Sequence, residues 1–514
     1  FQSAFIEKKV TADFPLYFCK RCEKETIYKL CEVCGKKTIK LYHCYNCPKL
    51  TPEDKCEHGD KQPYKRKEID INHYFNAALK HLGVRHYPDL IKGVRGTSNK
   101  THEPEHIAKG ILRAKQHIYV NKDGTTRFDM TQMPITHFKP VEIHTSVEKL
   151  RELGYLQDIY GKDLTDPEQV VEIKPQDIIL PKNVDAVEDG AHKVLKRVAD
   201  FMDDLLVNFY KLDPFYNIQK YEDLAGHMVL VLAPHTSGGI AGRIIGFCDS
   251  QVFFASPLLH AATRRDCDGD EACVVMLLDV LINFSRLYLP SSRGSTQDAP
   301  LVLTWKLTPA EVDDMVFNMD IAWKYPLEFY NACLEYKKPW EVKIDTVDDF
   351  LGQERQYQGW GFTHPIKNIN KGVLVSSYKT LPSMKDKILG QMGIAEKFMA
   401  VDEGDVARLV IEKHFLKDIK GNLRKFSMQQ FRCVACNEKF RRPPLTGKCS
   451  KCGGKIIFTI SEGSIVKYLE PSMDLAKKYH IPVYLQQTLD ILQRRVEGMF
   501  GREKEKQSGL GQWF

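Results

Sequence analysis

The chain has 514 residues, of which 43% are hydrophobic and 27% are charged, and its formal net charge is +7. This length exceeds what one hydrophobic core usually covers, so we expect several domains, and the composition excludes the disordered and fibrous classes. No apolar run is long and unbroken enough to span a membrane as a helix. Because the sequence opens with Phe1 and no signal peptide follows, we expect a processed chain or a piece of a longer one.

Cysteines are concentrated towards the two ends of the chain. Eleven of the 15 lie in two clusters built from Cys-x-x-Cys pairs, a spacing that suits tetrahedral zinc better than a disulfide network. Reduced thiols indicate a reducing compartment, so we expect a cytoplasmic protein. The other four are expected to be core residues rather than nucleophiles: Cys248, Cys267, Cys273 and Cys333.

Residues 1–63 are predicted to form zinc-binding modules with two sites. Gly35 follows the second pair of the first set, as a zinc knuckle prefers. The fourth ligand of the second set is either His58, the nearest candidate, or its rival His43. A closed set leaves no open coordination position, so structural zinc is expected. The two sets are Cys19, Cys22, Cys31 and Cys34, and Cys44, Cys47, Cys56 and His58.

Residues 64–220 are predicted to be a mixed, largely helical accessory region. Apolar spacing indicates a helix over Ile71–Leu82 and a long amphipathic helix over Asp189–Tyr210. The stretch from Lys100 to His117 is basic and rich in histidine. It could face nucleic acid or simply be solvated.

Short β-type runs separated by turns mark residues 221–380 as a small barrel with inserted helices. The turn after the first run contains His235, and its backbone amides and hydroxyls could cradle phosphate. The runs are Met228–Ala233, Ile244–Phe247, Val252–Ala255, Leu301–Trp305 and Val373–Val375.

Within this region, residues 264–270 read Arg-Arg-Asp-Cys-Asp-Gly-Asp. Alternate side chains of an extended backbone share a face, and Gly269 lets Asp268 and Asp270 converge on one cation. Magnesium takes a few carboxylate oxygens and leaves positions open for phosphates. An EF-hand is excluded, because the sixth and twelfth positions of this loop lack the Gly and Glu that an EF-hand requires. The alternative to a metal site is a plain solvated turn. The apolar run Ala272–Phe284 is predicted to be a buried helix that anchors this loop.

The C-terminal part combines basic residues with a third zinc set. Lys367–Lys455 contains 19 Lys and Arg against 8 Asp and Glu, an excess that suits a polyanion. We expect a basic, helical DNA-binding segment over 381–430, a zinc module with a partner-subunit contact region over 431–500, and a flexible tail over 501–514. The zinc ligands are Cys433, Cys436, Cys449 and Cys452.

The tail ends in the pattern Gln-x-x-Leu-x-x-aromatic-aromatic, formed by Gln507, Leu510, Trp513 and Phe514. This is the pattern of a sliding-clamp-binding peptide. Large apolar side chains on a polar tail are typical of a plug for a partner's pocket. The alternative is a tail that folds back on its own chain.

These motifs together resemble the large subunit of the archaeal family D DNA polymerase (PolD). The likeness rests on the Ala-Thr-Arg-Arg-Asp-Cys-Asp-Gly-Asp-Glu stretch, the Ala-Pro-His-Thr-Ser turn and the two zinc-rich ends, and it extends over nearly the whole chain. It implies a mixed α+β multidomain fold with a double-psi β-barrel catalytic core, inserted helices and zinc-binding modules. It also implies that the N-terminal half of a full large subunit, with a first barrel, is missing here.

The resemblance further implies a DNA-directed DNA polymerase that uses two Mg²⁺ ions for nucleotidyl transfer to a primer 3′-hydroxyl, with about three structural Zn²⁺ sites. Its partners would be primer-template DNA, dNTPs, a small subunit carrying a 3′-5′ exonuclease and the sliding clamp PCNA, with no membrane. The catalytic ligands would be Asp268 and Asp270, with Asp266 as a third candidate. Candidate phosphate contacts are Arg264, Arg265, Arg243, His235 and Lys379.

Two other functions fit parts of this pattern. A non-catalytic, zinc-containing replication scaffold would keep the zinc modules and the clamp peptide and leave the acidic loop structural. A relative of the RNA polymerase large subunit would share the acidic loop. The clamp peptide favours DNA replication, and the acidic loop favours an enzyme.

Overall fold

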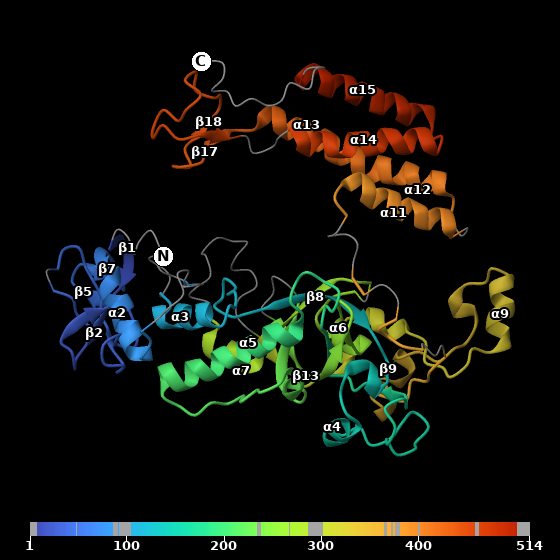
Figure 1. Ribbon diagram of the computed structural model, residues 1–514, viewed down its shortest axis with the longest axis horizontal. Coiled ribbons are helices and arrows are strands. Elements are labelled where there is room, and N and C mark those ends of the chain that lie inside the picture. Colours follow the sequence, from blue (N-terminus) through green and yellow to red (C-terminus); the bar gives the residue numbers. More distant parts are fainter. Residues whose placement is uncertain are drawn as a thin grey trace. The chain divides into compact units, whose positions relative to one another are not determined.

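The computed structural model divides into two compact units, residues 1–375 and 376–514, which are described one by one (Figure 1). In the described part of the chain, no helix is long and apolar enough to cross a membrane. The described residues are 8–47, 49–85, 91, 104–233, 238–266, 268–285, 302–363, 367–371, 374–375, 381–398, 401–457 and 462–500.

The N-terminal zinc region is closed by a pair of antiparallel strands, β1 (Lys9–Pro15) and β7 (Tyr64–Asp70). The predicted helix α2 (Ile71–Leu82) is confirmed, and it follows β7 directly. Asp70 caps α2 by accepting a hydrogen bond from the Asn72 N–H, and Gly83 ends it with a left-handed φ of 69°. The short strands inside the region are β2 (Tyr17–Cys19), β3 (Lys24–Thr26), β4 (Ile39–Lys40), β5 (Lys55–Cys56) and β6 (Gly59–Asp60).

The centre of the first unit is a mixed sheet of seven strands in the order β11-β14-β8-β15-β12-β13-β16. A further parallel pairing of β11 with β13 closes six of them into a ring, which makes a small barrel. The strands are β8 (Phe128–Pro134), β11 (Asp177–Pro181), β12 (Met228–Leu232), β13 (Gly238–Cys248), β14 (Val252–Ala255), β15 (Glu271–Met276) and β16 (Val302–Thr304).

The barrel draws on more of the chain than the sequence analysis assigned to it. Strands β8 and β11 come from 64–220, the region predicted to be largely helical. The buried helix predicted over Ala272–Phe284 is wrong for its first half, which is strand β15. The physical reason is that β15 is buried between β12 and β8, and a continuous apolar run with Val274 and Val275 fits such a strand as well as a helix. Its second half forms helix α7 (Leu277–Asn283).

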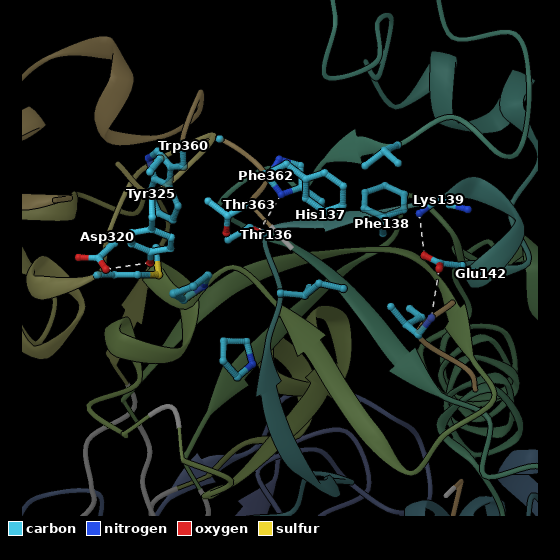
Figure 2. Close-up of a pocket in the computed structure, with 18 residues that line it drawn as sticks. Thr136, His137, Phe138, Lys139, Glu142, Asp320, Tyr325, Trp360, Phe362 and Thr363 are labelled. Atoms are coloured by element: carbon cyan, nitrogen blue, oxygen red, sulfur yellow. Dashed lines mark hydrogen bonds between the residues drawn. The ribbon is translucent and has the colours of Figure 1, made fainter. Parts of the chain in front are cut away.

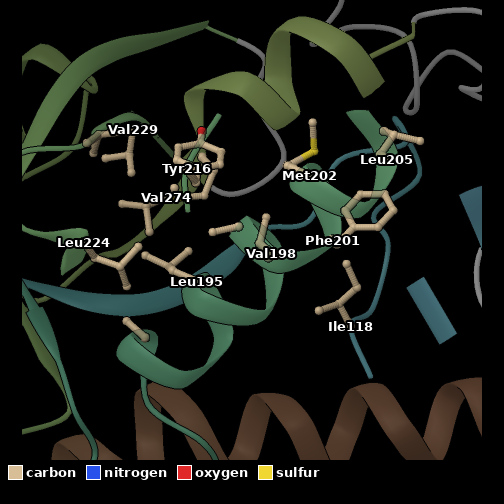
Figure 3. Close-up of a cluster of buried hydrophobic side chains, with 14 of the residues drawn as sticks. Ile118, Leu195, Val198, Phe201, Met202, Leu205, Tyr216, Leu224, Val229 and Val274 are labelled. Atoms are coloured by element: carbon tan, nitrogen blue, oxygen red, sulfur yellow. The ribbon is translucent and has the colours of Figure 1, made fainter. Parts of the chain in front are cut away.

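Helix α5 (Ala191–Asp204) packs apolar side chains against the barrel. It continues as a π-helix over Leu205–Tyr210, so the predicted long helix is confirmed. Leu195 and Val198 point towards Leu224 and Val274 (Figure 3), and all four are at most 1% exposed. Apolar burial of this kind is the main favourable term in folding, at about 25 cal/mol per Å².

Shorter elements complete the first unit. Strand β9 (His137–Phe138) pairs with β10 (Val171–Glu172) in a separate two-stranded ribbon. The α-helices are α3 (Ile107–Lys115), α4 (Val147–Glu152), α6 (Pro257–Ala262) and α9 (Leu327–Leu334). Single 3₁₀ turns lie at Pro140–Ile143, Tyr221–Leu224, Pro309–Glu311, Asp314–Asn318, Pro339–Glu341, Asp348–Phe350 and Glu354–Gln356.

The second unit is a helical bundle with a small three-stranded ribbon, which carries four cysteines, inserted into it. Helices on both sides of the ribbon share one core, in which Ile419, Leu423 and Leu489 are at most 1% exposed. The boundary predicted at residue 430 therefore divides helices that pack together. The elements are α11 (Met384–Lys397), α12 (Glu403–Leu409), a π-helix (Val410–Phe415), α13 (Leu416–Met428), β17 (Phe431–Cys433), β18 (Lys439–Phe440), β19 (Ile456–Ile457), α14 (Glu462–Lys478) and α15 (Val483–Phe500).

Candidate functional site

The acidic loop connects helix α6 to strand β15 at one end of the barrel. Asp266 and Asp268 are exposed to solvent, and Asp270 is half-buried. Gly269 between them has a φ of +104°, a conformation that side-chain-bearing residues rarely adopt. The sequence expectation of a sharp turn at this glycine is therefore confirmed.

Gln132 on strand β8 holds both ends of this loop. Its side-chain amide donates to the Asp266 carbonyl over 2.8 Å, and its backbone N–H donates to the Asp270 carbonyl over 2.9 Å. Gln132 is fully buried, and its Oε1 lies 3.1 Å from Nδ1 of the buried His260. The other ring nitrogen of His260 lies 3.1 Å from the Met133 carbonyl. The loop is thus attached through hydrogen bonds from a buried residue.

The two arginines in front of the aspartates belong to the same loop. Arg264 has a left-handed φ of 58°, is exposed, and donates to the Glu311 carbonyl over 3.3 Å. Arg265 is half-buried. Both cationic groups therefore lie within a few residues of the carboxylates, as the sequence places them.

The three aspartate carboxylates do not form one preformed ligand group in this conformation. Within the described residues, every group of three or more potential ligand atoms lying within 4.8 Å of one another consists of cysteines, with one histidine. Asp266, Asp268 and Asp270 form no such group, and all three stand at least partly open to solvent. A Mg²⁺ site that takes some of its ligands from substrate phosphates does not require a preformed cage of protein ligands.

Arg243, a predicted phosphate contact, is engaged elsewhere. Its guanidinium forms a two-bonded ion pair with the buried Asp177, at 2.8 Å and 2.7 Å, and this ion pair raises the pKa of Arg243. Arg243 pairs with Met228 at one end of strand β12. Asp270 directly precedes the start of β15, which lies beside the opposite end of β12. Six residues of strand, about 20 Å, separate the two ends, so the structure does not bring Arg243 to the acidic loop.

Several predicted site residues lie outside the described residues: His235, Lys379, Gln507, Leu510, Trp513 and Phe514. For His235 the flanking strands are described. Leu232 pairs with Gly239 on one side and with Cys273 on the other. The chain therefore leaves β12 and enters β13 at the end of the barrel where the acidic loop enters β15.

The three predicted cysteine sets are each brought together by the fold. Tetrahedral zinc with bonds of about 2.3 Å to sulfur places two sulfurs roughly 3.8 Å apart. The Sγ–Sγ distances are 3.5 Å for Cys19 and Cys34, 3.8 Å for Cys22 and Cys31, and 3.5 Å for Cys433 and Cys452. The donor sets therefore fit zinc in number, chemistry and spacing.

Backbone amides favour the thiolate form at two of these sets. The Lys36 N–H lowers the pKa of the Cys34 thiol to about 7, and the Cys436 N–H does the same for Cys433. The thiolate is the form that binds metal, so these two thiols favour a cation, whereas burial raises the pKa of Cys31 in the first set to about 12.

The geometry separates the two histidine candidates for the second set. His58 Nδ1 lies 3.4 Å from the Cys47 sulfur and 3.9 Å from the Cys56 sulfur, and it belongs to the set with Cys44. His43 is buried outside the set, and its Nδ1 has no hydrogen-bond partner among the described residues. The arrangement favours His58 as the fourth ligand.

A buried polar network beside the barrel was not predicted from the sequence. Lys109 donates to Asn283 over 2.7 Å, Asn283 donates to Asp279 over 2.7 Å, and Asp279 accepts from the Thr126 N–H over 2.7 Å. Burial raises the pKa of Asp279 to about 6 and lowers that of Lys109 to about 8. Lys109 thus faces neither solvent nor nucleic acid, although both were weighed for this basic stretch. The spacing of Asp279 and Asn283 in the sequence was the one signal for the network.

Comparison with known protein families matches residues 83–387 to a family described as "DNA polymerase II large subunit DP2, catalytic domain". Similar curated proteins carry the name "DNA polymerase II large subunit". The one from Archaeoglobus fulgidus is 49% identical over 98% of this chain and 44% of its own length. Those from Nanoarchaeum equitans and Pyrococcus furiosus are 46% and 45% identical, over 98% and 96% of this chain and 44% and 39% of their own lengths. The chain thus spans less than half the length of these relatives.

Proposed function

Because the chain belongs to the family of DNA polymerase II large subunits, we propose that it carries the catalytic loop of a replicative DNA-directed DNA polymerase. The polymerase would extend a primer 3′-hydroxyl with dNTPs. The observation that carries the proposal is the acidic loop from Asp266 to Asp270, which turns at Gly269 and is held at the Asp266 and Asp270 carbonyls by the buried Gln132.

The chemistry assigns a role to each side chain of the loop. Asp268 and Asp270 would hold Mg²⁺, with Asp266 as a third ligand. Two bound ions would activate the primer hydroxyl and neutralise charge on the incoming triphosphate. Arg264 and Arg265 precede the carboxylates in the same loop and would bind phosphate oxygens. Gln132 keeps the carboxylates in place, which matters because phosphoryl transfer depends mainly on positioning and charge.

The barrel is proposed to be a double-psi β-barrel. Support comes from its six-strand closure and its mixture of pairings, with β11–β13 and β14–β8 parallel and the other pairs of the ring antiparallel. Neighbouring strands of this ring are mostly not consecutive in the sequence, as expected for a barrel in which the connections between strands cross over. The loop then lies where β15 enters the barrel.

The remaining assignments concern partners. The basic region Lys367–Lys455 would follow the backbone of primer-template DNA without reading bases, and His235 and Lys379 would add phosphate contacts. The zinc sets would stabilise the modules that carry them. A small subunit with a 3′-5′ exonuclease would complete the enzyme, in the cytoplasm.

The tail is proposed to bind the ring-shaped sliding clamp PCNA. Leu510, Trp513 and Phe514 are spaced three and four residues apart, so one helical turn would place them on one face. Buried aromatic anchors each contribute about 2 kcal/mol or more. A loss of about 2 kcal/mol, the share of one anchor, corresponds to about thirty-fold. Because anchor contributions are not additive, replacing both Trp513 and Phe514 by Ala should weaken clamp binding at least about thirty-fold, while synthesis on short primers without the clamp stays unchanged. Equal clamp affinities would leave the tail without this role.

The proposal is tested by primer extension with a complete large subunit that contains this chain, together with a small subunit. Extension is expected with Mg²⁺ and none after its removal. Binding of primer-template DNA without any extension would favour the scaffold instead. Extension that requires ribonucleotides would favour an RNA polymerase.

A further inference from the structure

A pocket of about 350 Å³ lies where the chain leaves the C-terminal end of strand β8. It is formed by the chain that follows β8, by helix α6 and by the segments near residues 320 and 360. The volume falls in the range of small-molecule sites and exceeds what one ring system needs. Its lining includes Thr136, His137, Asp320, Tyr325, Trp360 and Phe362.

Aromatic rings form two sides of this pocket. Figure 2 shows Tyr325 and Trp360 on one side and His137 with Phe362 on the other. The rings of His137 and Phe362 are in contact, with centroids 4.8 Å apart. Burial lowers the pKa of His137 to about 4, so this ring is neutral near neutral pH. Flat apolar walls of this kind favour a flat ligand that can stack on them.

The polar groups in the pocket provide hydrogen bonds but little positive charge. Asp320 accepts a hydrogen bond from the Tyr325 hydroxyl over 2.8 Å, and its carboxylate has further lone pairs for an amino or imino group. Thr136 carries a hydroxyl that lies 2.8 Å from Nδ1 of His137. The pocket is lined by two carboxylates, Asp320 and Glu142, against one ammonium, Lys139. Such a charge balance disfavours a phosphate inside the pocket and suits a neutral ring with polar edges.

The wall that carries Trp360 is rigidly attached. The Glu172 carboxylate on β10 accepts hydrogen bonds from the Gly359 N–H over 2.8 Å and from the Trp360 N–H over 3.2 Å. Gly361 has a φ of +89°, and a Cβ there would lie 2.3 Å from the Ala322 carbonyl oxygen. Only glycine therefore fits at this position of the turn that presents Trp360 and Phe362.

The pocket and the acidic loop share their supports. Gln132 holds the loop, and Thr136 follows only four residues later, about 13 Å along an extended chain. Pro257 lines the pocket and begins α6, the helix that leads into the loop. Successive nucleotides of one DNA strand are about 3.4 Å apart, so the distance of about 13 Å between Gln132 and Thr136 corresponds to roughly four nucleotides.

We propose that this pocket binds a single unstacked nucleobase close to the catalytic loop. The inference rests on the proposed polymerase function, because that function would bring DNA next to the pocket. A base brings two stacking faces together with amino, imino and carbonyl edges, which match the rings, Asp320 and Thr136. The base is supplied either by the unpaired template strand or by a free nucleotide.

Photocrosslinking with the complete polymerase tests the proposal and distinguishes the two sources. In one arm, 5-iodouracil is placed at successive unpaired template positions of a primer-template; in the other, 5-iodo-dUTP is the probe. We expect crosslinks to Tyr325, Trp360 or Phe362 from a template position within about five nucleotides of the primer end. Crosslinks there from the nucleotide alone would assign the pocket to a free nucleotide. Crosslinks confined to other segments in both arms would overturn the proposal, and normal primer extension in that case would leave the polymerase function intact.

A matched pair of variants adds a binding test. Phe362→Leu removes one stacking ring, whereas Trp340→Leu removes a ring that is 77% exposed and does not line the pocket. Affinity for a template overhang should fall about tenfold in Phe362→Leu and stay unchanged in Trp340→Leu. An abasic residue at the crosslinking position should abolish the difference between wild type and Phe362→Leu. Equal losses in the two variants, or a difference that survives the abasic residue, would contradict a base-binding pocket.

Discussion

Gln132 and Asp270, 138 positions apart in the printed sequence, are joined by a hydrogen bond of 2.9 Å from the Gln132 N–H to the Asp270 carbonyl. The Gln132 side chain also donates to the Asp266 carbonyl over 2.8 Å. One buried residue therefore fixes the points at which the acidic loop leaves and rejoins the fold. Because both bonds use backbone carbonyls, the aspartate carboxylates stay available for ligands.

Replacing Gln132 by Leu should lower kcat by about ten- to a hundredfold, because the loop would lose one of its two fixed ends and a shift of about 1 Å is costly at a reacting centre. The Kd for primer-template DNA should stay within a few-fold. Steady-state kinetics and DNA titration check this. Gln157→Leu, at an exposed position, is the matched control. A Gln132→Leu enzyme with lowered Tm but unchanged kcat would show that the residue serves stability alone.

The second zinc set gives a prediction that separates its two histidines. His58→Ala should reduce the zinc content from about three to about two ions per chain, since three thiolates and water hold the ion less tightly. His43→Ala should leave about three, because its ring lies outside the ligand set. Metal analysis after exhaustive dialysis checks both variants. The reverse pattern would assign His43 as the ligand.

The buried carboxylate of Asp279 predicts a pH dependence of stability. Burial raises its folded pKa to about 6, above the value of about 3.9 in an unfolded chain. The folded state therefore binds more protons between these values, and its stability falls as the pH rises from about 4 to about 6. Asp279→Asn removes this dependence. It also lowers the free energy of unfolding by a constant amount of about 1–3 kcal/mol. The NH₂ group of the new asparagine would point at another donor, either the Asn283 amide or the Thr126 N–H.

Comparing the Tm of wild type and Asp279→Asn across this pH range isolates the effect from other titrating groups. The advantage of the wild type should be largest at the acidic end and should shrink as the pH rises through about 6. A difference in Tm that stays constant with pH would contradict a raised pKa at this carboxylate.

The sequence predicted features that depend on short, local patterns. Helix α2, strand β12 and the cysteine pairs each have a spacing that one local structure satisfies. The family resemblance is confirmed by the family match. Features set by distant segments were missed. Strand β8 has no strong apolar alternation, and its neighbours β14 and β15 come from more than a hundred residues away.

The same limit applied to individual site residues. Arg243 looked like a phosphate ligand because a lone arginine in a barrel strand gives no sign of its partner, Asp177, 66 residues earlier. Gln132 has no motif around it and became visible only through its contacts. The pocket near Trp360 joins segments that no sequence pattern connects.

The aspartates of the acidic loop are proposed to be the metal ligands of nucleotide addition. Single-nucleotide incorporation by the complete polymerase carrying Asp268→Ala or Asp270→Ala, with the DNA Kd measured in parallel, tests this role. The exposed Asp314→Ala, outside the loop, is the matched control. Each loop variant should reduce incorporation to background and keep the Kd within a few-fold of wild type, because it loses a metal ligand and no backbone contact. Near-normal incorporation by either loop variant would contradict the account.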